Sequence, residues 1–361
     1  MMLKKDNSIL IGAMAPTTNP GWIEAGLHLL AGIELSVSEV NNNGGINRVP
    51  IKLVVLDSAA NPQKASDLAD ELADLGVVAI VGEYHSVAAK AIADKADERN
   101  VPFLCTSAVI DNLIDKPSKW IARLPQVQSN GWKVYAEFLM NNKHMNIALV
   151  TAPSIYWKSG AYILHEQFSK HGGSIVEFDT QLIAPTELCD KLVDSEATAL
   201  LLLVGYPDPA IPLVKAIRND TRLKNLLIGA PAGQPEFNGW INELGTNGSA
   251  IPFLRYMPEK LNPLGQHVLK EIRKILNEEP SFVALEGYDA IRLLAKIMDL
   301  HGINRNSIAE SWSQVTINGT RGEIKLSQSP EMNLWQWQEA PVQVVDRDPF
   351  NQNQFRVLYS M

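Results

Sequence analysis

The fold is decided by SILIGAM (residues 8–14), EAGLHLLAGIELSVSEVNN (24–42) and IKLVVL (51–56). The first and third segments are short apolar runs, as expected for strands that are buried on both faces. In the second, apolar residues recur at steps of three and four, which is the spacing of one helix face, and the glycines 44 and 45 follow it. A strand, a helix and a second strand in this order predict a parallel β–α–β unit.

The same alternation continues along the chain. Up to residue 124 the sequence predicts strands at 77–81 and 102–105, with helices starting at Pro62 and Ser86. Beyond it, the predicted strands are 146–150, 174–178, 198–204 and 226–229, and the predicted helices are 129–141, 159–170, 208–218, 235–244, 263–277 and 282–301. Residues after Gly322 form short alternating runs instead, which predict antiparallel edge strands.

About ten strand–helix units are too many for one sheet, so the sequence predicts an α/β protein with two Rossmann-like lobes on parallel sheets. The first lobe is expected over residues 1 to about 124, and the second begins near 125. No Pro/Gly/Ser-rich linker separates them, which favours a hinge of crossing strands over a flexible tether.

Composition excludes several classes of protein. The 361 residues are 46% hydrophobic and 20% charged, which is ordinary for a soluble globular chain and excludes disorder, collagen and a disulfide scaffold. A net charge of −8 argues against a nucleic-acid partner. The two cysteines, Cys105 and Cys189, fall in or beside apolar stretches and are expected to be buried thiols.

No apolar run reaches the roughly 18 residues of a membrane span. The start, MMLKKDNSILIGAM, has neither a separate apolar segment nor a cleavage site of a secretory leader. We therefore expect a cytoplasmic protein if Met1 is the native start, and a periplasmic or cell-surface protein if a leader was removed.

Sequence signatures of catalysis are missing. The chain has no dinucleotide-binding G-x-G-x-x-G after a strand, no phosphate-binding P-loop and no G-x-S-x-G nucleophile turn. Its seven histidines show no metal-ligand spacing. We expect a protein that is not an enzyme and that needs no cofactor or metal.

The candidate site residues follow the predicted strands, because ligands of open α/β sheets bind at the carboxyl ends of strands. Ser86 opens a helix, where a side-chain cap and free amide groups suit a carboxylate or carbonyl oxygen. A helix cap alone also explains this serine, and ordinary packing also explains the aromatic residues. The candidates are Trp22, Tyr84, Ser86, Ser107, Ala108, Val109, Tyr156, Trp157, Tyr206 and Asp208.

Several segments together resemble type I periplasmic binding proteins of the Leu/Ile/Val-binding branch, the receptors of branched-chain amino acid ABC transporters. They include ILIGAMAP (9–16), AGIELSVSEVNNNGGI (31–46), PIKLVVLDSAANPQKA (50–65), VVAIVGEYHS (77–86), VPFLCTSA (101–108), EGYDAI (286–291) and NGTRGEIKL (318–326). The resemblance implies two lobes joined by a three-strand hinge, with lobe I at 1–124 plus about 250–330 and lobe II at 125–249 plus about 331–361. It also implies closure on a small-molecule ligand and an ABC transporter permease as partner.

The resemblance assigns roles to the candidates. Ser86 and Ser107, with the amides near Ala108 and Val109, are expected to hold a carboxylate or carbonyl of the ligand from lobe I. Tyr156 and Tyr206 are expected to close from lobe II, and Trp22 to face the variable part of the solute. Tyr84 and Trp157 complete the aromatic set.

Two features depart from this pattern. The disulfide seen near the start of some members has no counterpart, because Ala60 and His85 occupy those places. The other feature is a missing acid. Amino acid binders of the family usually have an acidic residue, which accepts the ligand's ammonium, after the strand that here ends at Gly229. This chain has Ala-Pro-Ala at 230–232, and the nearest acids are Glu236 and Asp208. We therefore expect amides, or carboxylates without an amino group, to bind at least as well as leucine or valine. VGEYHS also resembles the amide-sensing regulator of the same fold, so a cytoplasmic sensor with a regulatory protein partner is the alternative.

Overall fold

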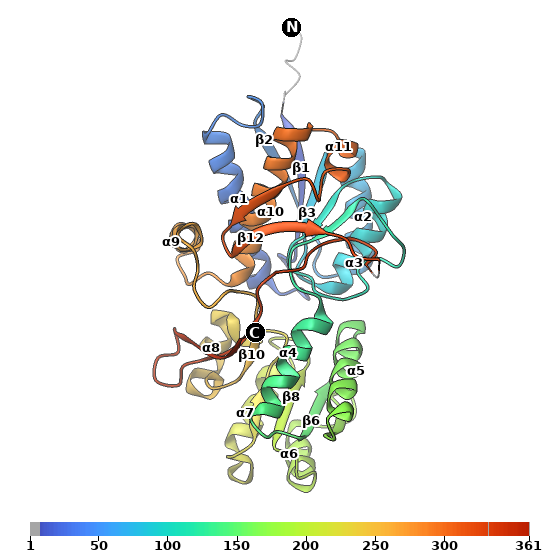
Figure 1. Cartoon of the computed structure of the whole chain (residues 1–361). Helices are drawn as coiled ribbons and strands as arrows, with labels where there is room; N and C mark the ends of the chain where they lie inside the picture. The colour runs from blue at the N-terminus through green and yellow to red at the C-terminus, as the bar shows by residue number, and fades with distance from the viewer. Residues whose placement is uncertain (1–7, 331, 361) are drawn as a thin grey trace. The chain divides into compact units, whose positions relative to one another are not determined.

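The computed structural model describes residues 8–330 and 332–360 (Figure 1). The chain forms two compact units, which we describe separately. Lobe I consists of Met1–Gln126 and Lys260–Pro341, and lobe II consists of Val127–Glu259 and Val342–Met361. Residues 1–7, which are the first half of MMLKKDNSILIGAM and include its two lysines, lie outside the described residues.

Lobe I contains an eight-stranded sheet in the order β11-β12-β13-β5-β4-β3-β1-β2. The pairs from β13 to β2 are all parallel, whereas β11 and β12 join antiparallel at one edge. The strands are β1 (Ile9–Ala15), β2 (Ile51–Asp57), β3 (Ala79–Gly82), β4 (Phe103–Cys105), β5 (Ile121–Arg123), β11 (Thr316–Gly319), β12 (Gly322–Ser327) and β13 (Trp335–Trp337).

Helices cover both faces of this sheet. The helices are α1 (Ile23–Asn42), α2 (Pro62–Asp74), α3 (Ser86–Glu98), α9 (Pro263–Leu276), α10 (Phe282–His301) and α11 (Arg305–Ala309). Figure 1 shows α1 beside α10 on one side of the strands and α2 beside α3 on the other. Helices α1 and α10 pack closely because Gly32 has no side chain: a Cβ there would lie 1.8 Å from the carbonyl oxygen of Ala284.

Lobe II contains a parallel four-stranded sheet in the order β7-β6-β8-β9. Its strands are β6 (Asn146–Thr151), β7 (Ser174–Asp179), β8 (Ala199–Leu203) and β9 (Leu227–Gly229). Its helices are α4 (Gln128–Asn141), α5 (Ile155–Lys170), α6 (Pro185–Asp194), α7 (Ala210–Asn219) and α8 (Asn238–Leu244), with short 3-10 turns at Thr221–Leu223, Gln234–Glu236 and Gly245–Gly248.

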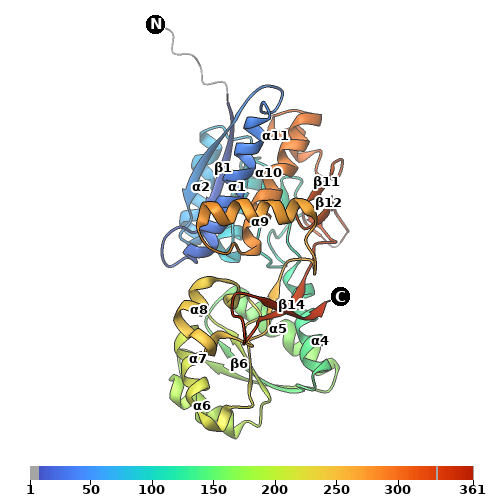
Figure 2. The same cartoon turned by 90° about the vertical axis from the view of Figure 1, so that its left-hand side faces the viewer.

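A second, antiparallel sheet completes lobe II. Its strands β10 (Phe253–Arg255), β14 (Gln343–Arg347) and β15 (Phe355–Ser360) pair in that order. Figure 2 shows the red strand β14 beside the green helix α4. The C-terminal segment is therefore part of lobe II.

The later lobe boundaries differ from those expected from the sequence, because strand pairing assigns β10 to lobe II and β13 to lobe I. Lobe I was expected to resume near residue 250, but β10 pairs with β14 and so belongs to lobe II up to Glu259. Lobe I was expected to end near 330, but β13 pairs with β5 and so belongs to lobe I up to Pro341. The first crossing follows Gln126 rather than residue 124.

Most predicted elements have counterparts, with three notable differences. The helix expected at 159–170 begins earlier, at Ile155, and the one expected at 235–244 is a 3-10 turn followed by α8. Helix α6 was not predicted. Both cysteines are buried free thiols, as expected. Among the described residues, no helix is long and apolar enough to cross a membrane.

Candidate functional site

The carboxyl ends of β1, β3 and β4 lie side by side in lobe I. Met14 is paired with Gly82, and Gly82 with Cys105, so the segments that follow these strands start from adjacent positions. Gly82 has φ +129°, and a Cβ on it would lie 2.0 Å from the carbonyl oxygen of Met14. Only glycine suits this position, because φ is positive and the backbone of the neighbouring strand leaves no room for a side chain.

Trp22, Tyr84 and His85 form an aromatic cluster at this edge. The ring centroids of Trp22 and Tyr84 are 5.3 Å apart, those of Tyr84 and His85 5.5 Å, and those of Trp22 and His85 6.4 Å. All three residues are partly exposed. The predicted residues Trp22 and Tyr84 are thus brought together, and His85, which the sequence did not assign to the site, joins them.

The imidazole of His85 is an acceptor. Its Nε2 receives a hydrogen bond from the backbone amide of Trp22 at 2.9 Å, so the ring proton is assigned to Nδ1. Burial lowers the pKa of His85 to about 4. The neutral ring therefore fixes the backbone at Trp22 relative to the β3–α3 turn.

A fully buried carboxyl group, Glu83, lies beneath this turn. Its Oε1 accepts hydrogen bonds from the amides of Tyr84 at 2.8 Å and His85 at 2.9 Å. Burial raises the pKa of Glu83 to about 7, although hydrogen bonding by Ser58 and the two amides opposes the rise. No described group meets Oε2 within full hydrogen-bond geometry.

Ser86 is not the helix cap that the sequence predicted. Helix α3 starts at Ser86, and the N-cap position is taken by His85, which has an extended backbone and makes no side-chain cap. Ser86 is a buried residue in the first turn, with 8% of its surface exposed. Its hydroxyl and the first amides of α3 remain suited to an oxygen of a ligand.

The loop after β4 provides Ser107, Ala108 and Val109, all of which are buried. The amide of Ala108 already donates to the carbonyl of Glu83 at 3.1 Å, so the expected donation of this amide to a ligand is not supported. Ser107 instead connects the loop to a buried carboxyl group, because its hydroxyl hydrogen-bonds Glu286.

Glu286 belongs to a buried ionic network that the sequence did not reveal. Arg321 lies 3.0 Å from Glu286 and 3.6 Å from Asp289, and all three side chains are fully buried. Asp289 also accepts hydrogen bonds from the amide and hydroxyl of Thr320, both at 2.7 Å. Burial raises the pKa of Glu286 to about 7, against the opposing effects of Arg321 and Ser107. The network joins α10 to the turn between β11 and β12.

Asp57, at the end of β2, fixes the loop that follows β1. Its carboxylate accepts hydrogen bonds from the amides of Thr17 at 2.7 Å and Ala59 at 3.0 Å, and Lys64 lies at 2.8 Å. Burial opposes ionisation, but the hydrogen bonds from Lys64, Thr18, Thr17 and Ala59 prevail and hold the pKa of Asp57 below its usual range. Asp57 directly follows the apolar run 51–56, so its place at a strand end was visible in the sequence, although it was not among the predicted site residues.

In lobe II, Tyr156 and Trp157 lie in the first turn of α5. Their ring centroids are 4.7 Å apart in an edge-on contact, and the ring of Trp132 lies 5.9 Å from that of Tyr156. The amide side chain of Gln128 donates to the carbonyl of Tyr156 at 3.0 Å. Both predicted aromatic residues are partly exposed at the carboxyl end of β6.

Tyr206 and Asp208 follow β8 in the same lobe. The Tyr206 ring lies 6.1 Å from the ring of the buried Trp240, whereas Asp208 is exposed. The described residues thus place Tyr156, Trp157 and Tyr206 after neighbouring parallel strands of one sheet.

The acid nearest to Gly229 is already in an ion pair. Glu236 is buried, and its carboxylate lies 2.8 Å from Nε of Arg255 and 3.1 Å from the Nη2 atom of that guanidinium. Arg347 donates to the backbone carbonyl of Glu236 at 2.8 Å. The guanidinium of Arg255 also lies over the ring of Phe355, 4.1 Å from its centroid. Glu236 therefore anchors the antiparallel sheet of lobe II.

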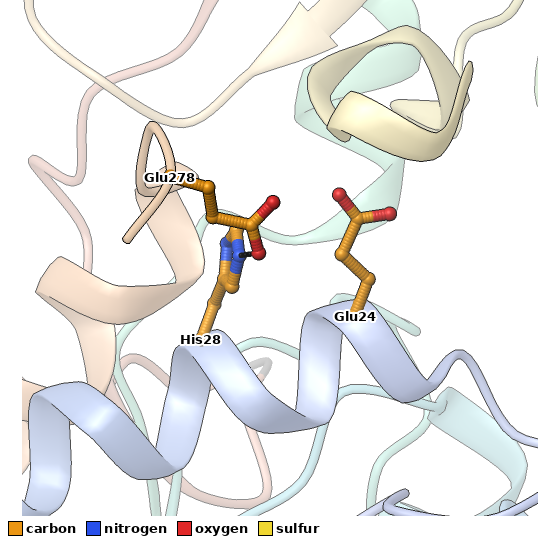
Figure 3. A group of neighbouring side chains, drawn as sticks. All are labelled: Glu24, His28 and Glu278. Carbon is orange, nitrogen blue, oxygen red and sulfur yellow. Dashed lines mark hydrogen bonds and ion pairs between the residues drawn. The ribbon is translucent and has the colours of Figure 1, made fainter. Parts of the chain in front are cut away.

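Glu24, His28 and Glu278 form a cluster in lobe I whose ligand-type atoms lie within 4.8 Å of one another (Figure 3). The amide of Ser281 donates to Nδ1 of His28 at 3.0 Å, which assigns the ring proton to Nε2, and Nε2 lies 3.0 Å from Glu278. A metal ion requires the lone pair of Nε2, which this tautomer lacks. The geometry fits a histidine that ties α1 to the segment before α10, and it does not fit a metal site.

The chain is similar to known proteins in both sequence and fold. Residues 8–335 match the family described as periplasmic binding protein. Leu/Ile/Val-binding protein homolog 3 of Brucella melitensis is 22% identical over 348 residues, which cover 92% of each chain.

Two solved structures illustrate the shared fold. The branched-chain amino acid transporter substrate binding protein LivJ of Streptococcus pneumoniae, in complex with isoleucine, superposes with a TM-score of 0.83 at 21% identity, over 97% of this chain and 99% of that one. A solute binding protein of an R. palustris ABC transporter, in complex with benzoate, superposes with a TM-score of 0.82 at 16% identity, over 98% and 96%. The resemblance seen in the sequence is confirmed: the chain belongs to the periplasmic binding protein family, whose members bind solutes without catalysis.

Proposed function

We propose that this solute-binding protein takes up a small carboxylate or amide that lacks an α-ammonium group. The observation that carries the proposal is the Glu236–Arg255 ion pair, because it engages the acid nearest to Gly229. An ammonium ion in a water-poor site requires a carboxylate or several carbonyl acceptors, since a buried unpaired charge costs several kcal/mol. Ala230, Pro231 and Ala232 supply no acidic side chain, which leaves the exposed Asp208 as the other candidate acid.

The aromatic residues favour a ligand with a flat or apolar body. Each lobe presents partly exposed rings at the carboxyl ends of its strands, where α/β proteins bind ligands. The residues that we propose to line the site are Trp22, Tyr84, Ser86, Ser107, Val109, Tyr156, Trp157 and Tyr206. Structural neighbours hold ligands of this kind, since they were solved in complex with benzoate, 3,4-dihydroxy benzoic acid and 4-hydroxybenzoate.

Family membership also supports a proposal for the partner protein and for the cellular location. We propose that the protein delivers its solute to an ABC transporter permease, and that it acts in the periplasm or at the cell surface. Nothing in the described residues favours a cytoplasmic regulator over this role. The chain crosses between its lobes three times, after Gln126, Glu259 and Pro341, which suits closure by a hinge.

A thermal-shift series tests the ligand class. Benzoate, 4-hydroxybenzoate and benzamide are expected to raise the melting temperature at least as much as leucine or valine. A ligand that binds the native state stabilises it by about 2.7 kcal/mol when its concentration is 100 times Kd. Tight binding of leucine that Asp208→Asn or Glu236→Gln abolishes would contradict the proposal and restore an amino acid ligand. Glu236→Gln needs a check of its melting temperature, because it also weakens the pair with Arg255.

Ser86→Ala is expected to weaken ligand binding by about 1–2 kcal/mol, the size of a hydrogen bond to a charged group. Stability should change little, because Ser86 does not cap α3. Asn61→Ala is the matched control: Asn61 caps α2 by accepting from the amide of Lys64 at 2.9 Å, so its loss should lower stability by about 1 kcal/mol and leave affinity intact. Calorimetry with the best ligand of the thermal series measures both variants, and an unchanged affinity of Ser86→Ala removes this serine from the site.

A further inference from the structure

Glu83 links three parts of the candidate site. Its Oε1 accepts from two consecutive amides, those of Tyr84 and His85, which directly precede α3. The imidazole of His85 in turn accepts from the amide of Trp22. One buried carboxyl group thereby holds the turn that carries Tyr84 and His85, and through His85 it holds the backbone at Trp22.

The same carboxyl group faces the start of a helix. The first amides of α3 give its N-terminus a partial positive charge, which favours an anion. An ionised Glu83 hydrogen-bonded to the two preceding amides places a negative charge beside that terminus and offsets its attraction for a second anion. A neutral Glu83 leaves the attraction in place.

We propose that Glu83 is a positioning residue, which holds the aromatic cluster in place and controls, by gaining or losing a proton, how strongly α3 attracts an anionic ligand. The proposal rests on the function proposed above, in which a ligand carboxylate or carbonyl lies at the start of α3. The proton comes from solvent and is accepted by the carboxyl group, whose Oε2 is free of a full hydrogen bond among the described residues.

Among the described residues, no other group on the turn that carries Glu83 titrates between about pH 6 and pH 8. Asp57, which raises the pKa of Glu83 from the side of β2, is ionised throughout and is paired with Lys64. His85 is neutral because burial lowers its pKa to about 4. On the β4 side, burial raises the pKa of the Cys105 thiol to about 12, so this thiol is uncharged.

Helix α10, which also packs against β3, carries Glu286 and Asp289 opposite Arg321. The pKa of Glu286 is also raised by burial to about 7. A pH profile of the wild type therefore contains contributions from two carboxyl groups. A Glu83 variant is needed to separate them, because it leaves Glu286 unchanged.

Calorimetric titrations with benzoate and benzamide test the proposal. Benzoate stays ionised above about pH 5, so its own titration does not intervene. We expect its Kd to rise about threefold to fivefold from pH 6 to pH 8 in the wild type, because Glu83 becomes ionised. Neutral benzamide should show a smaller rise. Glu83→Gln keeps an oxygen acceptor for the two amides but cannot ionise. In this variant the Kd for benzoate should therefore rise less between pH 6 and pH 8 than in the wild type.

A second measurement needs no ligand. The fluorescence of Trp22, obtained as the difference between the wild type and Trp22→Phe, is expected to change with a midpoint near pH 7 and to be constant in the Glu83→Gln background. Glu83→Leu, which leaves both amides without their acceptor, should show an altered Trp22 signal at every pH. A purely structural role would alter the signal of Glu83→Leu without any titration in the wild type.

The outcomes separate the two proposals. If benzoate and benzamide both bind and Glu83→Gln leaves the difference between their pH profiles unchanged, the role of Glu83 is overturned while the ligand class stands. If neither binds, the ligand class fails, and the fluorescence titration decides alone: a Trp22 signal that is independent of pH, or that titrates equally in Glu83→Gln, overturns the role of Glu83.

Discussion

Arg321→Met is expected to lower the free energy of unfolding by about 3–5 kcal/mol, because it removes one partner of a buried ionic network. The side chain of Arg321 is fully buried, and it lies 3.0 Å from Glu286 and 3.6 Å from Asp289. Its guanidinium also lies over the ring of Trp337, 5.3 Å from the centroid. Methionine preserves much of the volume but leaves two carboxyl groups in an apolar interior without the guanidinium that pairs with both of them.

Denaturant unfolding at neutral pH measures this loss, and two variants act as controls. Arg222→Met removes an exposed guanidinium that pairs with Asp220 and Asp190, and it should change stability by less than about 1 kcal/mol. The double variant Arg321→Met/Glu286→Gln should recover part of the loss, because it also removes one uncompensated carboxylate. A loss of under about 1 kcal/mol for Arg321→Met alone would show that the network contributes little to stability.

Gly82→Ala is expected to destabilise lobe I by about 3–5 kcal/mol, the sum of backbone strain and overpacking. Gly82 has φ +129°, which L-residues rarely adopt, and its new Cβ would lie 2.0 Å from the carbonyl oxygen of Met14. The obstacle is backbone of the neighbouring strand β1, so relief requires β1 and β3 to move apart. Because Trp22 and Tyr84 follow these two strands, ligand binding should weaken as well.

Gly76→Ala is the matched control for this substitution. Gly76 also has a positive φ, +78°, but a Cβ there meets no atom within 4 Å. It should therefore cost only the strain, about 1 kcal/mol, and leave the site intact. Thermal unfolding and ligand titration of the two variants compare the effects, and equal losses would show that the approach to Met14 is unimportant.

The sequence predicted the repeating units of this fold well, because strand and helix periodicities are local. Buried apolar runs such as 198–204 and amphipathic stretches such as 24–42 each indicate one element without reference to the rest of the chain. It did not predict which sheet a short strand joins. Strands β10 and β13 each have three residues, and their pairing with β14 and β5 decides the lobe to which they belong.

The candidate site, like the fold, was predicted from the sequence only in part. The rule that ligands bind at strand ends led to Trp22, Tyr84, Ser86 and Ser107, which the structure places at one edge of the lobe I sheet. The carboxyl groups that hold those residues were not foreseen. Glu83 is adjacent to its partners Tyr84 and His85, but the sequence did not reveal its burial, whereas the partners of Glu286 are distant in the sequence. Glu286 contacts Arg321 and Ser107.

Glu236 illustrates how a partner decides the role of a charged residue. From the sequence it was a candidate acceptor for a ligand ammonium, since it is the acid nearest to Gly229. Its ion pair with Arg255, nineteen positions further along the chain, could not be inferred from spacing. The ligand class proposed here depends on that pair more than on any motif.

The division of each lobe between distant segments has a consequence for synthesis on the ribosome. The first 126 residues emerge without α10, which covers one face of their sheet, and without β13, which pairs with β5. Lobe II emerges without β14 and β15, so Arg255 and Glu236 lack the strand that carries Arg347 until residues 342–361 appear. Neither lobe is complete before these later segments have been synthesised, so until then the nascent chain exposes apolar sheet surface and depends on protection from aggregation.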